Sequence, residues 1–174
     1  IIQHVKQGDK VLATADSNTA VDNLVDNLNS QGCEVVRVGN PVRVTQSLLE
    51  HTLDYKVQQT DKFKRSSKLW DQVDELKEKQ KDHVLPSGKN RRGLGNKKIK
   101  RLAENGKSTR GLSPGKIKGM ARWIEIQDEI DQIVDEAMKL EEQATREHLD
   151  KADVICTTNS TAGSDVINEF FESQ

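Results

Sequence analysis

Two short segments near the ends of the chain place the strongest constraint on its fold. Residues 10–24 read KVLATADSNTAVDNL, and residues 152–165 read ADVICTTNSTAGSD. In each, an apolar run gives way to small polar residues, which is how a parallel α/β sheet presents a ligand-binding loop at the carboxyl end of a strand. The long stretch between them carries almost no strand pattern. The sequence therefore predicts one small α/β unit interrupted by a helical insertion.

The first segment predicts a strand followed by a capped helix. Residues 11–15 are mostly apolar, as in a strand covered on both faces. Ser17 and Asn18 follow, and apolar residues then recur at helical spacing until Gly32 ends the pattern. A helix amino terminus with spare amides and short polar side chains can bind an anion. The alternative is that Ser17 and Asn18 only cap the helix.

The letters of these segments resemble a known family. ADSNTAVDNL is similar to motif Ia of superfamily 1 helicases, in the branch of the nonsense-mediated-decay helicase and the immunoglobulin mu-binding helicase, and residues 152–165 resemble motif Ib. Residues 33–44, CEVVRVGNPVRV, resemble the family's next strand with its Arg-x-Gly-x-Pro-x-Arg signature, and residues 47–54 resemble the following helix. The middle of the chain shares only its helical character with the family.

The resemblance implies a nucleic-acid site formed by two loops. In these helicases the loops after the first and last of these strands hold the nucleic-acid backbone. The residues implicated are Ser17 and Asn18 in the first loop and Thr157, Thr158 and Asn159 in the second. Small hydrogen-bonding side chains suit phosphate and sugar contacts that position a strand without reading its sequence. The parent function implied is ATP-driven unwinding of DNA or RNA, with ATP and Mg²⁺ as cofactors.

The 174 residues themselves lack the residues of an ATP site. The family's phosphate loop ends in Gly-Lys-Ser/Thr, and the Gly-Lys pairs at residues 88–89 and 115–116 lack its spacing and its preceding strand. The Asp-Glu box that should follow motif Ib is also missing. We therefore expect a fragment of the first RecA-like domain of a larger helicase, with no catalytic residue, metal site or cofactor of its own.

Composition is polar for a compact globule, with 33% apolar and 32% charged residues. A surface-rich helical insertion accounts for this. No apolar run is long enough to span a membrane. Cys33 and Cys156 stand outside any Cys-x-x-Cys pattern, as in a reduced intracellular protein. We expect a soluble, cytoplasmic protein in which both thiols are buried structural groups.

The insertion predicts a helical hairpin. Residues 55–84 contain no Gly or Pro and read as one helix. In the return helix, apolar residues are spaced alternately by three and four, as in a coiled-coil seam. The seam residues are Trp123, Ile126, Ile130, Ile133, Ala137, Leu140 and Ala144. Two such helices would pack antiparallel as a stalk, and an uncovered seam could bring two copies of the chain together.

An internal repeat lies at the tip of this predicted hairpin. RGLGNKKIKRLA at residues 92–103 matches RGLSPGKIKGMA at residues 110–121, with an offset of 18 residues. Each copy predicts a turn followed by a short helix, and together they predict a small two-helix cap. The core expected between the copies consists of Leu94, Ile99 and Leu102 against Leu112, Ile117 and Met120.

This tip is strongly basic. Residues 86–122 contain twelve Lys or Arg against one Glu, a net charge of +11 in a chain of net charge −1. Such segregation favours a polyanion partner, and the lack of an aromatic residue before Trp123 favours phosphate contact over base stacking. The basic residues singled out are Lys97, Lys98, Lys100, Arg101, Lys116 and Lys118. The alternative is a tip that pairs with the acidic face of the return helix.

The predicted fold class is α/β, a partial RecA-like parallel sheet interrupted by a long antiparallel helical hairpin (coiled-coil stalk) with a small basic helical cap. The strands are expected at residues 10–15, 34–38 and 154–158. The predicted parts are RecA-like at 1–54 and 152–174, stalk helices at 55–85 and 123–151, and the cap at 86–122. Expected partners are single-stranded DNA or RNA and the remainder of the helicase, with no membrane. The alternative function is a coiled-coil nucleic-acid or protein interaction module without motor activity.

Overall fold

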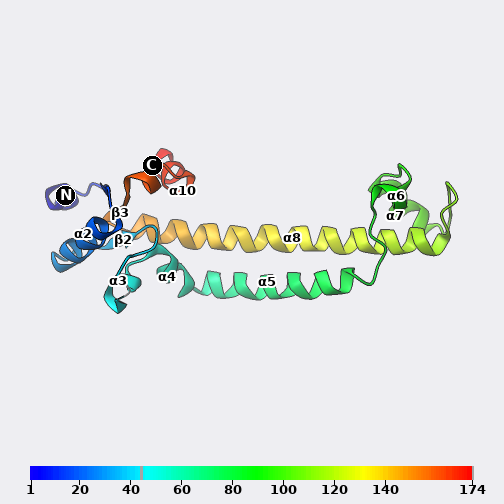
Figure 1. The fold of residues 1–174 in the computed structure, drawn as a ribbon, viewed down its shortest axis with the longest axis horizontal. Helices are drawn as coiled ribbons and strands as arrows, with labels where there is room; N and C mark the ends of the chain where they lie inside the picture. Colours follow the sequence, from blue (N-terminus) through cyan, green and yellow to red (C-terminus); the bar gives the residue numbers. More distant parts are fainter. Residues whose placement is uncertain (44, 174) are drawn as a thin grey trace. The chain divides into compact units, whose positions relative to one another are not determined.

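Three short segments pair into a parallel sheet with strand order β1-β3-β2 in the computed structural model, which describes residues 1–43 and 45–173 (Figure 1). The strands are β1 (Val11–Ala15), β2 (Val35–Arg37) and β3 (Val154–Thr158). Each lies within one residue of its predicted bounds, which confirms the α/β class and the parallel sheet. Because all three strands run the same way, their carboxyl ends meet at one edge of the sheet. Val44 and Gln174, which end two of the predicted segments, lie outside the described residues.

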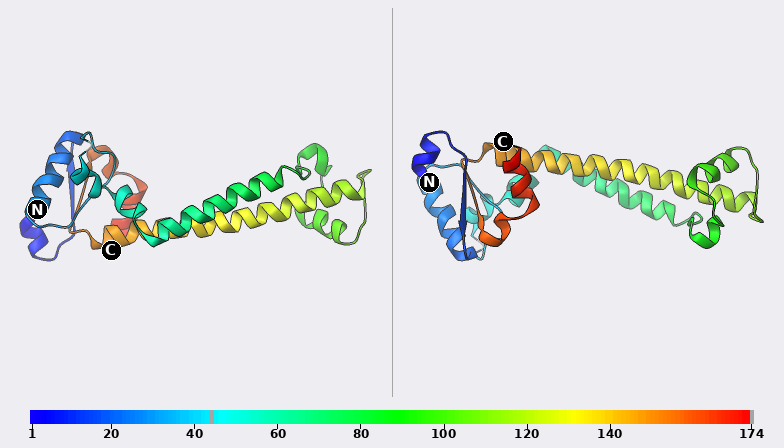
Figure 2. Two further views of the ribbon diagram at one scale, coloured as in Figure 1. Left: turned by 90° about the horizontal axis from the view of Figure 1, so that it is seen from below. Right: turned by 90° about the horizontal axis from the view of Figure 1, so that it is seen from above.

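Helices cover both faces of this sheet (Figure 2). On one face lie α1 (Ile2–Lys6), α2 (Asn18–Ser30) and α3 (Gln46–Glu50), and on the other lie α4 (Leu53–Gln58), the last turns of α8 (Pro114–Lys151) and α10 (Asp165–Glu172). A short helix, α9 (Asn159–Ala162), follows β3 directly. Val154 and Cys156 enter one apolar cluster and Ile155 the other, as the alternation of a strand requires. Residues 1–64 and 140–174 together form this unit.

Residues 65–139 form a second unit, built on α5 (Asp61–Gln80) and α8. Val73 shares a buried cluster with Ile126 and Ile130. Gln80 donates from Nε2 to the Trp123 carbonyl at 3.2 Å and to Gln127 Oε1 at 3.0 Å. From Val73 to Gln80 along α5, the contacted residues of α8 change from Ile126 and Ile130 to Trp123 and Gln127. This stretch of the seam is therefore covered within the chain.

Two helix boundaries differ from the predicted ones. Residues 55–84 do not form one helix, because Thr60 starts a new one: its hydroxyl accepts from the Phe63 amide at 3.1 Å and donates to the Val57 carbonyl at 2.6 Å. The second copy of the repeat is not a separate short helix either. Pro114 is the first residue of α8, which continues to Lys151 because no further Pro or helix-ending turn interrupts it.

The repeat forms its own apolar cluster within the second unit. The first copy contributes α7 (Asn96–Glu104) and the second contributes the start of α8, while α6 (Gly88–Arg91) precedes both. The six predicted core residues all lie in this cluster. Gly119 stands where the first copy has Arg101, and a Cβ at Gly119 would lie 2.7 Å from Val84 Cγ2. The chain entering the tip therefore passes against α8 at a position that lacks a side chain.

Candidate nucleic-acid interface

The carboxyl edge of the sheet brings the two predicted loops together. Ser17 and Asn18 follow β1, Thr158 ends β3, and the parallel pairing of these strands sets the loops beside each other. Asn159 Nδ2 donates to Asp16 Oδ1, which ties one loop to the other. With the loop after β2, these segments line a depression of about 560 Å³. Three of the five predicted loop residues, Ser17, Asn18 and Thr158, line it.

Two hydroxyl groups in these loops cap helices. Ser17 Oγ accepts from the Ala20 amide at 3.2 Å and begins α2. Thr158 Oγ1 accepts from the Thr161 amide at 3.3 Å and begins α9. The capping role considered as the alternative for Ser17 is therefore present in the structure. Capping also holds each loop in one conformation at the rim of the depression.

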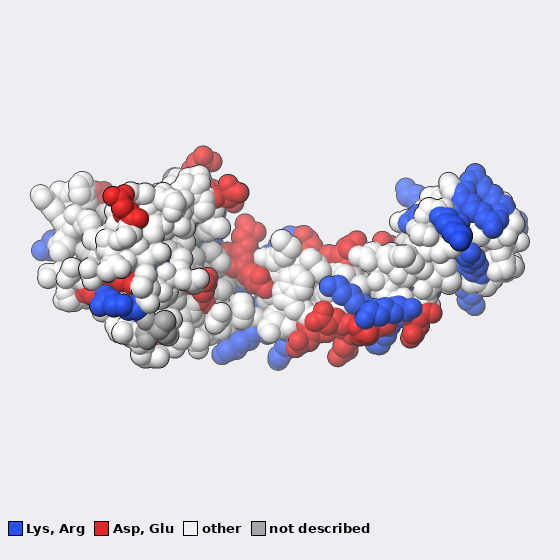
Figure 3. Space-filling view, viewed as in Figure 1, with Lys and Arg blue, Asp and Glu red and all other residues white. Residues whose placement is uncertain are grey.

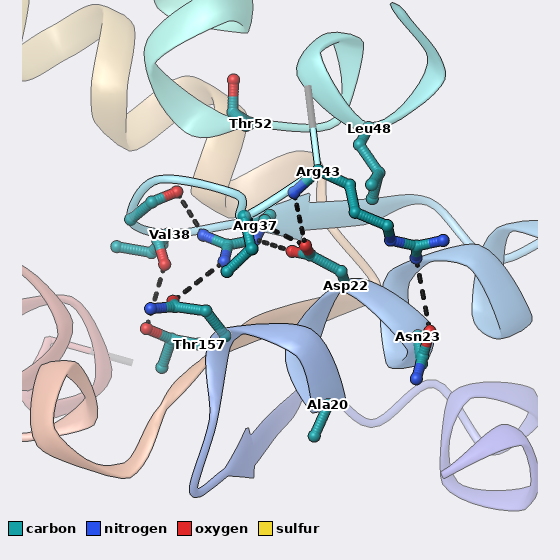
Figure 4. Close-up of polar contacts among 12 residues, drawn as sticks. Ala20, Asp22, Asn23, Arg37, Val38, Arg43, Leu48, Thr52 and Thr157 are labelled. Atoms are coloured by element: carbon teal, nitrogen blue, oxygen red, sulfur yellow. Dashed lines mark hydrogen bonds and ion pairs between the residues drawn. The ribbon is translucent and has the colours of Figure 1, made fainter. Parts of the chain in front are cut away.

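A buried ion pair lies behind the loops. The side chains of Arg37 and Asp22 are fully buried, with Nε 2.8 Å from Oδ1 (Figure 4). Arg37 also donates from Nη2 to Asn18 Oδ1 at 3.0 Å and from Nη1 to the Gly39 carbonyl. Asp22 Oδ2 accepts from the Val42 amide at 3.1 Å. One guanidinium thus joins α2, β2 and the loop after β2.

This network sets the orientation of Asn18. Asn18 is exposed, and because its Oδ1 accepts from Arg37, the amide nitrogen is the group left to donate to a partner. Among residues 1–43 and 45–173, no hydrogen bond to Asn18 Nδ2 is present. An amide NH₂ is a donor suited to a phosphate oxygen. The sequence offered a signal for the network, since Arg37 interrupts an otherwise apolar strand, yet its burial against Asp22 was not foreseen.

The side chain of Thr157 is buried at the sheet and does not line the depression. Its side chain is fully buried, and Oγ1 donates to the Val38 carbonyl at 3.1 Å (Figure 4). Consecutive side chains of a strand point to opposite faces, so Thr157 and the last strand residue, Thr158, cannot both face the rim in the same way. Thr157 joins the ends of β3 and β2.

The predicted basic residues at the tip differ in their partners. Figure 3 shows Lys and Arg gathered over the part of the second unit that carries α6 and α7. Lys100 forms an ion pair with Asp128, and Arg122 pairs with Glu125 at 3.1 Å. The acidic face of α8 therefore neutralises part of the tip. The structure shows no ion pair, within the chain segments it describes, for Lys97, Lys98, Arg101, Lys116 and Lys118.

Neither the Gly-Lys pair at residues 88–89 nor that at residues 115–116 forms a phosphate loop. Gly106, Lys107 and Ser108 do not form one either, because they follow the helix α7 and not a strand. Gly88 and Lys89 begin the four-residue α6, and Gly115 and Lys116 lie in the first turn of α8. No strand precedes either pair in the described part of the chain, whereas a phosphate loop joins a strand to a helix. These segments therefore lack the setting in which a phosphate loop holds ATP phosphates and Mg²⁺. None of the described helices has the length and apolar character needed to cross a membrane.

Both cysteines are free and buried in the cluster on one face of the sheet. Burial raises the pKa of the Cys156 thiol to about 12, against a smaller opposing effect of the nearby Arg37 charge. A thiol of this kind stays protonated and unreactive at neutral pH. This agrees with the structural role predicted for it.

Comparisons with known proteins extend over almost the whole chain. A profile of the AAA domain family matches residues 2–173. An uncharacterized ATP-dependent helicase of Methanocaldococcus jannaschii is 38% identical over 170 residues, which cover 96% of this chain and 26% of that protein. The DNA-binding protein SMUBP-2 of Rattus norvegicus is 30% identical over 165 residues, covering 95% of this chain and 13% of that protein. The DNA polymerase alpha-associated DNA helicase A of Schizosaccharomyces pombe is 46% identical over 54 residues, covering 31% of this chain and 8% of that protein.

Proposed function

This chain belongs to the AAA domain family of superfamily 1 helicases, and we propose that it is a nucleic-acid-binding part of an ATP-dependent helicase. The observation that carries the proposal is the convergence of Ser17, Asn18 and Thr158 on one depression at the carboxyl edge of the sheet. Short polar groups at a sheet edge suit the backbone of a single strand of DNA or RNA. The names of two relatives, a DNA-binding protein and a DNA helicase, support a nucleic-acid partner.

In this proposal each loop residue has a separate task. The amide nitrogen of Asn18 donates to a phosphate oxygen, while Arg37 holds that amide in place from behind. Ser17 and Thr158 cap the starts of α2 and α9, and Thr157 joins the ends of β3 and β2 through its hydrogen bond to the Val38 carbonyl. ATP and Mg²⁺ act in the whole helicase, and the 174 residues alone do not hydrolyse ATP. The helices α5 and α8 serve as a stalk for the basic tip.

An isosteric substitution tests the depression without breaking its support. Asn18→Asp keeps the Oδ1 acceptor for Arg37 and replaces the amide donor by a negative oxygen that repels phosphate. We expect fluorescence anisotropy with a labelled oligo-dT strand at low salt to show affinity weaker by about tenfold, equivalent to the loss of about 1.4 kcal/mol. The matched control is Asn23→Asp, which adds the same charge to an exposed residue of the same helix, outside the depression, and keeps the acceptor for Arg43.

The two variants separate local contact from general repulsion. Equal weakening by Asn18→Asp and Asn23→Asp would mean that net charge alone matters, and the assignment of the depression would fail. Unchanged binding by both, measured at several salt concentrations, would exclude the edge loops from the interface. The labelled strand should also be tested as RNA, because backbone contacts of this kind serve either nucleic acid.

A further inference from the structure

The two copies of the repeat at the tip hold each other. Arg92 and Arg110 occupy equivalent positions, both with positive φ (47° and 55°), and each donates from Nη1 to the carbonyl oxygen of the other. Each guanidinium also lies over the glycine after the other arginine. A Cβ at Gly93 or at Gly111 would lie 2.8 Å from the facing Nη1. Reciprocal contacts between equivalent groups are the mark of a twofold relation.

The same relation extends from this contact to the core and the charges. Equivalent leucines and isoleucines of the two copies meet in one buried cluster. Lys98, which is exposed, and Lys116, which is half-buried, are each the third residue of their helix, α7 and α8 respectively. Neither lysine has an ion-pair partner among the residues that the structure describes. The tip therefore presents one cationic position twice, in two copies related by an approximate twofold axis.

We propose that this surface binds duplex DNA, with one copy of the repeat against each strand. The two antiparallel strands of a duplex are themselves related by twofold axes, so a twofold pair of cations can meet equivalent phosphates. The inference rests on the proposed function, since it takes nucleic acid as the partner. It adds that the tip binds double-stranded DNA, whereas the edge loops bind a single strand.

Two features of the tip favour a duplex backbone over unpaired bases. Residues 86–122 contain no aromatic side chain, so bases have no stacking platform there. The charge is high and of one sign, which matches the dense phosphates of a duplex. The proposal commits to DNA because two relatives are named a DNA-binding protein and a DNA helicase.

Matched substitutions at the two copies test the proposal in the full 174-residue chain. Lys98→Gln, Lys116→Gln and the double variant each leave the apolar cluster intact. The control is Lys139→Gln, which removes one positive charge from an exposed position of α8 that pairs with Asp135 outside the repeat. Anisotropy is measured with a labelled blunt DNA hairpin, with its RNA counterpart and with a labelled oligo-dT strand, each across a salt series.

For the DNA hairpin we expect the slope of log affinity against log salt to become shallower by about 0.9 for each single variant and about 1.8 for the double variant. The control should leave this slope unchanged, and all four variants should leave the oligo-dT slope unchanged. Thermal unfolding of each variant at the wild-type temperature checks that the tip stays folded. Equal effects of the two single variants are the signature of the twofold arrangement.

Other outcomes overturn the inference in distinguishable ways. An effect from only one of the two lysines would refute the twofold use of the repeat. Equal losses on oligo-dT and hairpin would mean that the tip does not select a duplex, and tighter binding of the RNA hairpin would refute the choice of DNA. If oligo-dT binds and no hairpin does, the inference fails while the proposed function stands. If nothing binds at low salt, the proposed function fails as well.

Discussion

Charge at the sheet edge and charge at the tip are handled in opposite ways. Arg37 is fully buried, and its guanidinium nitrogens donate to Asp22, Asn18 and Gly39. At the tip, Lys98 and Arg101 are exposed and find no ion-pair partner in the described part of the chain. At the edge, therefore, charge helps to determine the structure. At the tip an apolar cluster and the reciprocal contacts of Arg92 and Arg110 determine the structure, and the charge of exposed residues such as Lys98 and Arg101 is left for a partner.

The difference follows from the cost of removing a charge from water. A buried guanidinium is tolerated only when a carboxylate and further acceptors replace its hydration. Such a group cannot easily change partners, which suits a scaffold that must hold Asn18 still. An exposed lysine keeps its hydration and is free to exchange water and counterions for phosphate.

Removing one arginine from each region gives the most direct test of this contrast. We expect Arg37→Ala to lower the free energy of unfolding by about 3–5 kcal/mol, because it leaves the Asp22 carboxylate buried without its partner. Arg101→Ala at the tip should change it by less than about 0.5 kcal/mol. Urea denaturation followed by circular dichroism measures both. Similar losses of unfolding free energy in the two variants would mean that charge supports the structure equally in the two regions.

The apolar core of the tip is tested by two glycines of the same helix. Gly119→Ala places a Cβ 2.7 Å from Val84 Cγ2, so we expect a loss of about 1–3 kcal/mol despite the better helix propensity of alanine. Gly115→Ala meets no atom within 4 Å and should be neutral or stabilising by up to about 1 kcal/mol. Thermal unfolding of the two variants should therefore shift in opposite directions. A gain from Gly119→Ala would show that the segment around Val84 is free to move aside.

The burial of the Cys156 thiol predicts a smaller, pH-dependent effect on the free energy of unfolding. The pKa of the folded Cys156 thiol is about 12, against an ordinary value of 9.0, so unfolding releases a proton between these pH values. The free energy of unfolding should therefore fall as pH rises above about 9, by up to about 1.4 kcal/mol per pH unit. Cys156→Ala lacks this component. Urea denaturation of both proteins at pH 8 and pH 10 isolates it, and identical pH dependence would contradict the raised pKa.

Local patterns in the sequence were sufficient to predict much of this fold. The apolar runs located β1 and β3 to within one residue, because both faces of the sheet are covered and these strands are largely apolar. The resemblance to the helicase family located β2 equally closely. The repeat predicted which residues would share a core, because equivalent positions of two similar units meet when the units pack together. The helix expected in the second copy begins at Pro114, whose fixed φ suits the first position of a helix.

What escaped prediction depends on contacts between residues far apart in the sequence. Arg37 read as part of a family signature, and only the fold shows that Asp22 neutralises it and that Asn18 accepts from it. Pairing of the tip with the acidic face of the return helix was the alternative considered for these residues, but the sequence did not tell which lysine would pair, and only the fold assigns Asp128 to Lys100. At the loops, Ser17 and Thr158 line the same depression. Their roles as ligands of nucleic acid stay a prediction.

The strand order has a consequence for how the chain folds during synthesis. The central strand, β3, is the last of the three to be made, so β1 and β2 leave the ribosome with no neighbour to pair with. At roughly 5–20 residues per second, the wait from β2 to β3 is on the order of ten seconds. Within that time residues 65–139 can complete their own contacts, which are made without the sheet. We expect the insertion to fold first and the domain that carries it to close afterwards.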